Sequence, residues 1–381
     1  MLKANYLKTV LLIVLVVGIV SNLAGAQPFR FTASADNRPY DAANLARWEW
    51  LLDEMDRLFV DDEGVFHIMP GDFDSPEITD DTLKTQFGPE TIWYPVVGNH
   101  EAETPADMTW IRGAYGSLPY IVNSGPPGCE TTTYSWDYGN AHFIAINEYY
   151  DGTSDVGTDG DVVDALYNWL AADLAANTQP VVFVIGHEPA YPQGAHTEDS
   201  LNKYPTNRDR FWKLLNDEKV IAYLCGHTHY YSALQQAQTG DYPCDAFTWQ
   251  IDCGNAGNPR ELEQTFVDVA VTETDVTFQV FQGLKDADYQ MTDFWIVDIP
   301  TPIEEAHNPS PADGATEVAI DGVLEWAAGA GAESHNVYFG TTNPPPFVQN
   351  QAGTIYDPPG TMDYETTYYW RIDELGSDGT V

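Results

Sequence analysis

Short apolar runs alternate with amphipathic helical patterns from Phe29 to about Ile299, and this alternation most constrains the fold. Runs 29–35 and 65–69 predict two strands. Asp41 is a suitable N-cap for a helix between them. Apolar residues recur there at helical spacing, at Leu45, Trp48, Leu52, Met55 and Phe59. A strand, a helix and a strand in succession make a right-handed crossover, so the two strands are predicted to be parallel and the region to be α/β.

Further apolar runs continue the same pattern. They predict strands at Ile92 to Val97, Ala141 to Asn147, Val181 to Ile185, Val220 to Cys225 and Phe266 to Val271. A second helix is predicted from apolar residues at helical spacing, namely Val163, Leu166, Leu170 and Leu174.

Polar residues follow five of these strands at the point where each strand ends. The segments are Asp36, Gly71-Asp72, Gly98-Asn99-His100-Glu101, Gly186-His187 and Gly226-His227-Thr228-His229. In open α/β sheets ligands bind beyond the carboxyl ends of the strands, so these side chains are predicted to meet at one rim. Carboxylate, amide and imidazole donors suit zinc, iron, manganese or nickel, and they do not form a thiolate site. The sequence therefore predicts a metal site at this rim.

The motif order D-x-x, GD, GNHE, GH and GHTH resembles the calcineurin-like metallophosphoesterase superfamily, which includes the purple acid phosphatases. The resemblance extends roughly from Phe29 to Gly283. It implies a four-layer α/β/β/α sandwich over residues 27–299 and a small-molecule phosphate ester as substrate. It also implies two bound metal ions, with iron, zinc, manganese and nickel all left open. Such a pair of ions generates hydroxide near neutral pH, and no covalent enzyme nucleophile is required.

The same resemblance assigns a role to each side chain. It implies that Asp72 bridges the two metals, and that Asp36 and His229 complete the first site. It implies a second site whose ligands are Asn99, His187 and His227. His100 is expected beside the metals, where it protonates or stabilises the leaving oxygen.

The chain departs from the family pattern at the first motif. Family members commonly read D-x-H, whereas Arg38 stands here at the histidine position. The tyrosine of purple acid phosphatases, three residues after the aspartate of GD, is replaced by Ser75. The first site is therefore expected to be short of a protein ligand, and a weak first site or a one-metal enzyme is an alternative. Arg38 either holds substrate phosphate through its planar fork or forms a structural salt bridge.

Other polar residues have less specific interpretations. His196 lies in a loop like the one in which purple acid phosphatases place a substrate-contacting histidine, and an exposed loop histidine is the alternative. Glu101 and Glu188 flank predicted ligands and are expected to accept hydrogen bonds from imidazole N–H groups. His67 and His142 fall within strand patterns and are interpreted as hydrogen-bonded core residues.

Residues 1–26 are predicted to be a secretory signal peptide. Lys3 and Lys8 precede an apolar run that ends at Val20, and the small residues Ala24-Gly25-Ala26 follow it. The run is shorter than the roughly 20 residues of a membrane span, so no span is expected after cleavage, and an uncleaved anchor is the alternative. The protein is therefore predicted to be secreted, into the periplasm or the extracellular space.

Charge and cysteine content fit an exported protein. The chain has 16 basic and 58 acidic residues, a formal net charge of −42, which disfavours nucleic-acid and anionic-membrane partners. Export permits disulfides among the four cysteines at Cys129, Cys225, Cys244 and Cys253. Three pairings are possible, and close spacing favours Cys244 with Cys253.

A second region begins after Pro300. Prolines at positions 300, 302, 309 and 311 predict a linker over residues 300–313. Residues 314–381 contain strand-like runs at 323–326, 335–339 and 367–372, and no helix pattern. They resemble a fibronectin type III-like β-sandwich with Trp326 and Trp370 as core aromatics, and the last strand is expected to be missing. Such a module is a candidate for contacts with a cell surface or with other domains.

Two function classes follow from these observations. The first is a secreted metal-dependent phosphoesterase acting on mono- or diesters, with nucleotides as an alternative substrate class. The second is a non-catalytic metal-binding surface or adhesion protein that retains the fold, in which the departure at Arg38 has abolished turnover. Metal content together with an assay on generic esters separates the two.

Overall fold

The computed structural model describes residues 27–59, 64–257, 263–299 and 303–376. The predicted signal peptide, 1–26, lies outside the described residues. Two sheets dominate the region up to Asp298. In the described residues the first sheet has six strands, in the order β13 (Gln290–Asp298), β12 (Asp275–Gly283), β11 (Gln264–Val271), β1 (Phe29–Ala33), β2 (Gly64–Pro70) and β3 (Trp93–Val96).

The second sheet has seven strands within the same described ranges. Their order is β4 (Ile121–Ser124), β5 (Tyr134–Tyr138), β6 (Ala141–Ala145), β7 (Val181–Ile185), β8 (Ala222–Cys225), β10 (Trp249–Cys253) and β9 (Tyr231–Gln235). Strands β1, β2 and β3 run parallel to one another, as do β6, β7, β8 and β10. The parallel pairing predicted for the first two strands is confirmed.

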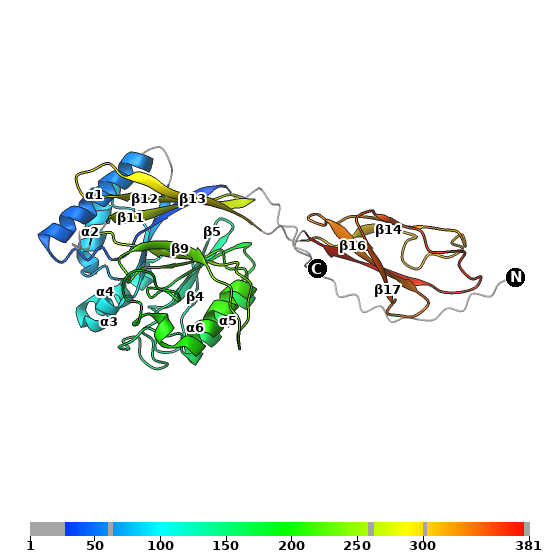
Figure 1. The fold of residues 1–381 in the computed structure, drawn as a ribbon, viewed down its shortest axis with the longest axis horizontal. Helices are drawn as coiled ribbons and strands as arrows, with labels where there is room; N and C mark the ends of the chain where they lie inside the picture. The colour runs from blue at the N-terminus through cyan, green and yellow to red at the C-terminus, as the bar shows by residue number, and fades with distance from the viewer. Residues whose placement is uncertain (1–26, 60–63, 258–262, 300–302, 377–381) are drawn as a thin grey trace.

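Helices cover the outer face of each sheet (Figure 1). They are α1 (Ala42–Phe59), α2 (Pro76–Phe87), α3 (Asn99–Glu103) and α4 (Pro105–Ala114) by the first sheet, and α5 (Asp164–Ala176) and α6 (Pro205–Asp217) by the second. Two short 3₁₀ turns occupy Tyr115–Ser117 (η1) and Leu201–Lys203 (η2). None of the helices in the described ranges has the length and apolar character needed to cross a bilayer.

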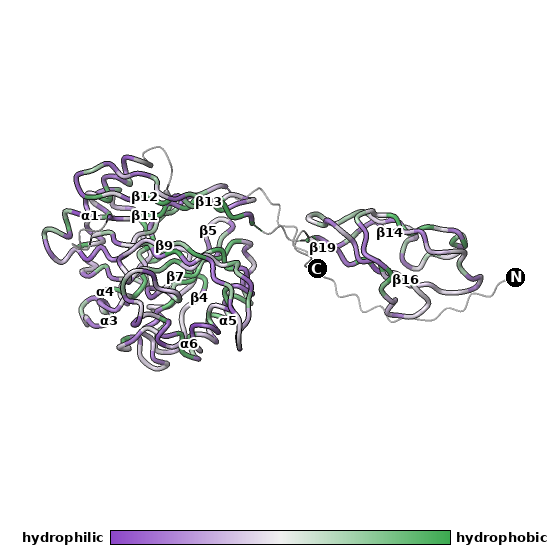
Figure 2. The backbone as a smooth tube through the Cα atoms, viewed as in Figure 1, coloured by the Kyte–Doolittle hydropathy of each residue, from purple (hydrophilic) through white to green (hydrophobic). Residues whose placement is uncertain are grey.

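The main core lies between the two sheets. Phe31 of the first sheet packs edge-on against Phe143 and Phe183 of the second, with ring centroids 5.2 Å apart in each case. Separate apolar clusters lie under α5 and α6 and under α1. Figure 2 shows hydrophobic stretches gathered along the strands and hydrophilic stretches along the outer turns. The four-layer α/β/β/α order predicted from the sequence is confirmed.

Helix α1 forms where the sequence predicts it. The Asp41 side chain accepts hydrogen bonds from the backbone amides of Ala43 and Asn44, which otherwise have no partner in the first turn. Trp48, Leu52 and Met55 are buried against the first sheet. The cap starts the helix five residues beyond Asp36, so the chain leaves the rim directly after the first motif.

The prediction of a disulfide between Cys244 and Cys253 is wrong, because the four cysteines are free in the structure. Cys253 is buried in the core between the sheets, whereas Cys244 packs against the cluster under α5 and α6. The second sheet separates these two clusters, so residues that are close in the sequence lie on opposite faces. His67 and His142 are buried and hydrogen-bonded, as predicted.

The C-terminal region is all-β over its described residues. One sheet contains β14 (His307–Ser310), β15 (Leu324–Ala327) and β18 (Ile355–Tyr356), and the other contains β17 (Phe347–Gln351), β16 (Ser334–Gly340) and β19 (Tyr369–Leu375). Trp326 is buried in the small core, and Trp370 packs against it. Strand β14 lies within the range predicted as linker, because its backbone pairs with β15 despite Pro309.

Candidate metal centre

The predicted ligands lie in loops at the carboxyl ends of neighbouring strands. Asp36 and Asp72 follow β1 and β2, and Asn99 begins α3 after β3. His187 follows β7, and His227 and His229 follow β8. Because the strands of each group are neighbours and parallel, their loops emerge side by side. The oxygen donors therefore come from the first sheet and the imidazoles from the second.

Asp36, Asp72 and His229 make up one group of donors. A ligand atom from each lies within 4.8 Å of the others, and the three side chains are buried. His229 Nε2 is 3.4 Å from Asp36 Oδ1. Within the described chain, Asp36 Oδ1 is buried and accepts no hydrogen bond. A cation fits such a group, because it would compensate a buried carboxylate oxygen that otherwise lacks a partner.

His187 and His227 form the second group. His187 Nδ1 is 2.8 Å from the carbonyl oxygen of Pro70, and His227 Nε2 is 3.2 Å from that of Asp199. A carbonyl only accepts, so each of these nitrogens carries the proton. The other nitrogens, His187 Nε2 and His227 Nδ1, face each other at 3.2 Å. A proton or a cation between them would satisfy both nitrogens.

Asp72 lies between the two groups. Its Oδ1 is 3.4 Å from His187 Nε2, and it also belongs to the group with Asp36 and His229. Gly98, the residue before Asn99, packs directly on Asp72, and the Asn99 side-chain oxygen is buried without a hydrogen bond in the described residues. The structure thus brings together five of the six side chains predicted as ligands, and it places Asn99 directly after the glycine that packs on Asp72.

Electrostatics in this cluster also favours a cation. Burial raises the pKa of Asp36 well above its usual range, and the charge of Asp72 adds to this, although His187 opposes it. Burial and the neighbouring His187 lower the pKa of His227 to about 3, so its imidazole is neutral. A neutral imidazole is the form that binds metal.

The ligand loops have strained backbones. Asp36, Asp72, His227 and His229 have φ values of 58°, 55°, 71° and 61°, in the left-handed region. Such residues cost on the order of 1–3 kcal/mol each and cluster at functional sites. Two glycines let the loops approach closely. A Cβ on Gly98 would collide with Asp72, and one on Gly226 would lie 2.6 Å from Ala35 Cβ and 2.9 Å from Asp36 Oδ2.

Buried carboxylates hold these loops through the backbone. Glu101 accepts hydrogen bonds from the amides of Asp72, Phe73 and Gly98. Glu188 accepts from the Tyr149 hydroxyl and the Gly160 amide. The prediction that Glu101 and Glu188 accept from imidazole N–H groups is therefore wrong, because backbone carbonyls at Pro70 and Asp199 take that role.

Glu148 was missed by the sequence analysis. It follows β6 and accepts hydrogen bonds from the amides of His187 and Glu188 at 2.8 and 2.7 Å, and it also bonds the Tyr223 hydroxyl. The available signal was its place after an apolar strand, the same place that identified the ligands. No other predicted ligand lies next to Glu148 in the sequence, so the pattern alone did not single it out.

Arg38 lies beside His100. Its Nη2 donates to His100 Nδ1 at 3.1 Å, and its Nε is 3.4 Å from Asp74 Oδ1. The other ring nitrogen, His100 Nε2, then carries the proton and lies 3.7 Å from Asp72 Oδ2. Burial raises the pKa of Asp74 to about 6, although Arg38 and His100 lower it. Asp74 is a further residue that the sequence analysis did not identify.

His196 lies over the imidazoles of the second sheet. Its ring centroid is 4.3 Å from that of His227 and 5.6 Å from that of His229. His196 Nδ1 is 3.0 Å from Asp199 Oδ2, and His196, Asp199 and His227 also form a group of potential metal donors. Since the Asp199 carbonyl holds His227, one residue connects both histidines.

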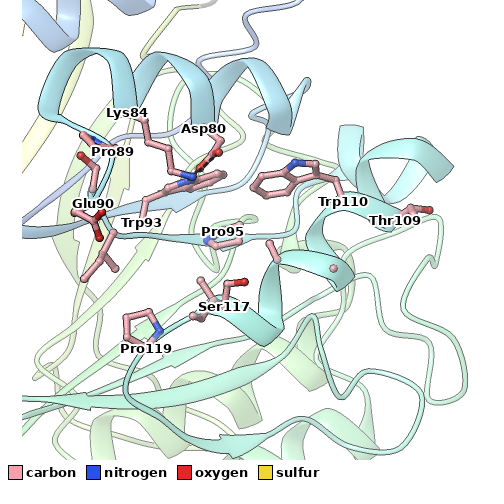
Figure 3. A pocket seen from close by; sticks show the side chains of 15 residues that line it. Asp80, Lys84, Pro89, Glu90, Trp93, Pro95, Thr109, Trp110, Ser117 and Pro119 are labelled. Atoms are coloured by element: carbon pink, nitrogen blue, oxygen red, sulfur yellow. Dashed lines mark hydrogen bonds and ion pairs between the residues drawn. The ribbon is translucent and has the colours of Figure 1, made fainter.

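A separate hollow of about 680 Å³ lies between α2, β3 and α4 (Figure 3). Trp93 and Trp110 stack at its wall with ring centroids 5.7 Å apart. Asp80 accepts from Trp93 Nε1 and pairs with Lys84. None of the six predicted ligands lines this hollow.

Comparisons with known proteins agree with this geometry. The calcineurin-like phosphoesterase family matches residues 30–231, which is more than half of the chain and contains all five motifs. The chain belongs to this family. Calcineurin-like phosphoesterases are metal-dependent hydrolases of phosphate esters, and the cluster of oxygen and imidazole donors fits that chemistry.

Solved structures resemble this chain at low sequence identity. A dimetal phosphatase from Danio rerio is 14% identical, with 71% of this chain and 99% of that chain covered and a TM-score of 0.49. A purple acid phosphatase from yellow lupin (Lupinus luteus) seeds is 16% identical, with 72% and 54% covered and a TM-score of 0.50. Thus the chain spans about half the length of that lupin protein. A comparison with curated protein sequences gave no match.

Proposed function

We propose that this chain is a secreted hydrolase that cleaves phosphate mono- or diesters at a dinuclear metal centre. One observation carries the proposal. His187 Nε2 and His227 Nδ1 face each other at 3.2 Å beside the Asp72 carboxylate. Two ring nitrogens and a carboxylate at one point would hold one cation, and Asp36 with His229 would hold a second one against the same Asp72.

Each residue has a distinct role in this proposal. Asp72 bridges the two cations, with Asp36 and His229 at the first and Asn99, His187 and His227 at the second. The bound ions would be divalent or trivalent, drawn from iron, zinc, manganese and nickel, and would supply charge neutralisation and an activated water. The chain positions the ester so that water attacks phosphorus in line with the leaving oxygen.

His100 and Arg38 act on the substrate. Arg38 donates a hydrogen bond to His100 Nδ1, so the proton on His100 Nε2 is the one available for the leaving oxygen. The remaining N–H groups of the Arg38 fork are suited to hold a phosphate oxygen. His196 is proposed as a further phosphate contact from the opposite sheet, oriented by Asp199.

The other assignments remain part of the proposal. Residues 1–26 are a signal peptide, residues 27–299 the esterase domain, and the C-terminal region a fibronectin type III-like module that begins at β14. The module is proposed to contact a cell surface or other domains. An exported location suits hydrolysis of organic phosphate esters outside the cell.

The proposal is tested by elemental analysis of the purified protein together with assays on p-nitrophenyl phosphate and bis(p-nitrophenyl) phosphate. We expect two metal ions per chain and turnover of at least one substrate. His100→Ala is expected to retain the metals while kcat falls by about 10²–10⁴-fold, the usual contribution of a general acid. Asn99→Ala is expected to lose both turnover and second-site metal. One or no metal with no hydrolysis supports the non-catalytic binding protein instead.

A further inference from the structure

The loop after β8 carries two metal-ligand candidates in disfavoured backbone conformations. His227 and His229 have φ values of 71° and 61°, and Thr228 stands between them. In the left-handed region the Cβ of a non-glycine residue crowds the following carbonyl oxygen. Two such residues separated by a single residue need support from outside the loop.

Thr228 provides a connection to such support. It is fully buried, and its Oγ1 donates to Asp252 Oδ2 at 2.6 Å. The backbone amide of Tyr230 donates to the same Oγ1 at 3.2 Å. The hydroxyl therefore ties the middle of the loop to its exit and to a carboxylate on another strand.

Asp252 is placed by the sheet. Strand β10 runs parallel to β8 with Asp252 opposite Cys225, so the carboxylate lies beside the loop that leaves β8. Its neighbours Ile251 and Cys253 face the core between the sheets, and side chains alternate along a strand, so Asp252 faces the opposite side. Its Oδ1 accepts from the Gly254 amide at 3.0 Å.

Asp252 has no evident use in its own strand. It is fully buried, and within the described ranges it forms no ion pair with a lysine, arginine or histidine. Burying a carboxylate without a basic partner is costly, so a role in packing alone does not explain it. Among the described residues, its side-chain hydrogen bonds run to Gly254 and to the loop that carries His227 and His229.

We propose that Asp252 is a positioning residue for the metal centre, acting through Thr228 to fix the spacing and direction of His227 and His229. This inference rests on the proposed metal centre. His227 belongs to the second cation site and His229 to the first. The hydrogen bond between Asp252 and Thr228, which we name the clamp, therefore sets the geometry of both sites.

The clamp is tested by Mn²⁺ titration calorimetry on the full chain after removal of metal. Thr228→Val keeps the shape and removes the hydroxyl, and we expect it to weaken Mn²⁺ binding by roughly 10–100-fold, as loss of contacts that orient metal ligands does. Thr228→Ser keeps the hydroxyl and should restore most of the affinity. Asp252→Ala removes the acceptor and should match Thr228→Val, and the double variant should be no weaker than the weaker single variant.

The melting temperature of each metal-free variant separates positioning from scaffolding. Unchanged Mn²⁺ affinity in a folded Thr228→Val variant overturns the clamp. The clamp is also overturned if Mn²⁺ affinity and melting temperature fall together in all variants, Thr228→Ser included. A wild-type chain that binds Mn²⁺ but hydrolyses no ester rejects the proposed function and leaves the clamp result standing. A wild-type chain that binds none of Mn²⁺, Zn²⁺, Ni²⁺ and Fe²⁺ rejects both.

Discussion

Arg38 occupies the position where related chains commonly carry a metal-binding histidine. Its guanidinium cannot bind a cation, yet it does not point away from the site, since it donates to His100. The proposed first cation site therefore has Asp36, Asp72 and His229 as its protein donors. The replacement exchanges a metal ligand for a positive charge beside the proposed acid.

Arg38→His is expected to tighten Mn²⁺ binding at the first site by roughly tenfold or more, because an imidazole adds a donor and removes a repelling charge. Calorimetry of the metal-free protein measures this. Arg38→Ala is the matched control, because it removes the charge without adding a donor. Equal affinities in Arg38→His and Arg38→Ala would show that the imidazole does not reach the cation.

Glu188 is expected to make the metal-free protein less stable as pH rises. Burial raises its pKa to about 8, and the Glu148 charge contributes. A carboxyl with a raised folded pKa stabilises the fold fully below its unfolded pKa, near 4.5, and that stability is lost as pH rises through about 8. Melting temperatures between these pH values should therefore decline less in Glu188→Gln than in the wild type, and equal slopes would exclude Glu188 as the cause.

At the scale of single elements, the N-cap of α1 determines where the chain turns away from the rim. Asp41→Ala removes the acceptor for the Ala43 and Asn44 amides and should lower the free energy of unfolding by about 1 kcal/mol. Urea denaturation measures this change. Asp53→Ala, at an exposed position later in α1, is the control and should have little effect. A similar loss in both variants would assign the effect to charge and not to capping.

The sequence predicted the strands that carry the site better than the strands that complete the sheets. Strand β7 matches its predicted range, and β1, β2, β3, β6, β8 and β11 differ at their ends by one or two residues. These central strands are mostly buried and therefore rich in apolar residues. Strand β13 lies at a sheet edge with mostly exposed residues, and the short α3 follows immediately from Asn99, so neither has a clear hydrophobic pattern.

The proposed ligand set was recognisable in the sequence because each donor directly follows an apolar strand. Glu148 and Asp252 were not, because their role lies in contacts made across the sheet after folding. Glu148 reaches the amides after β7, and Asp252 reaches the loop after β8. Such pairings depend on strand order, which a single sequence does not specify. Cys244 and Cys253 illustrate the same point, since sequence distance did not predict which face each occupies.

At the scale of the whole molecule, the net charge of −42 opposes compaction. Added salt shortens the Debye length from about 10 Å at 0.1 M to about 3 Å at 1 M, which screens this repulsion. The melting temperature of the metal-free protein should therefore rise with NaCl over this range. KCl should act equally if screening is the cause, and a fall in melting temperature with either salt would contradict the explanation.

The division of donors between the two sheets has a mechanical consequence. Asp36, Asp72 and Asn99 move with one half of the sandwich, and His187, His227 and His229 move with the other. A bound cation would then link the two halves and resist sliding of one half over the other. Dissociation of the ion would therefore be coupled to separation of the two halves.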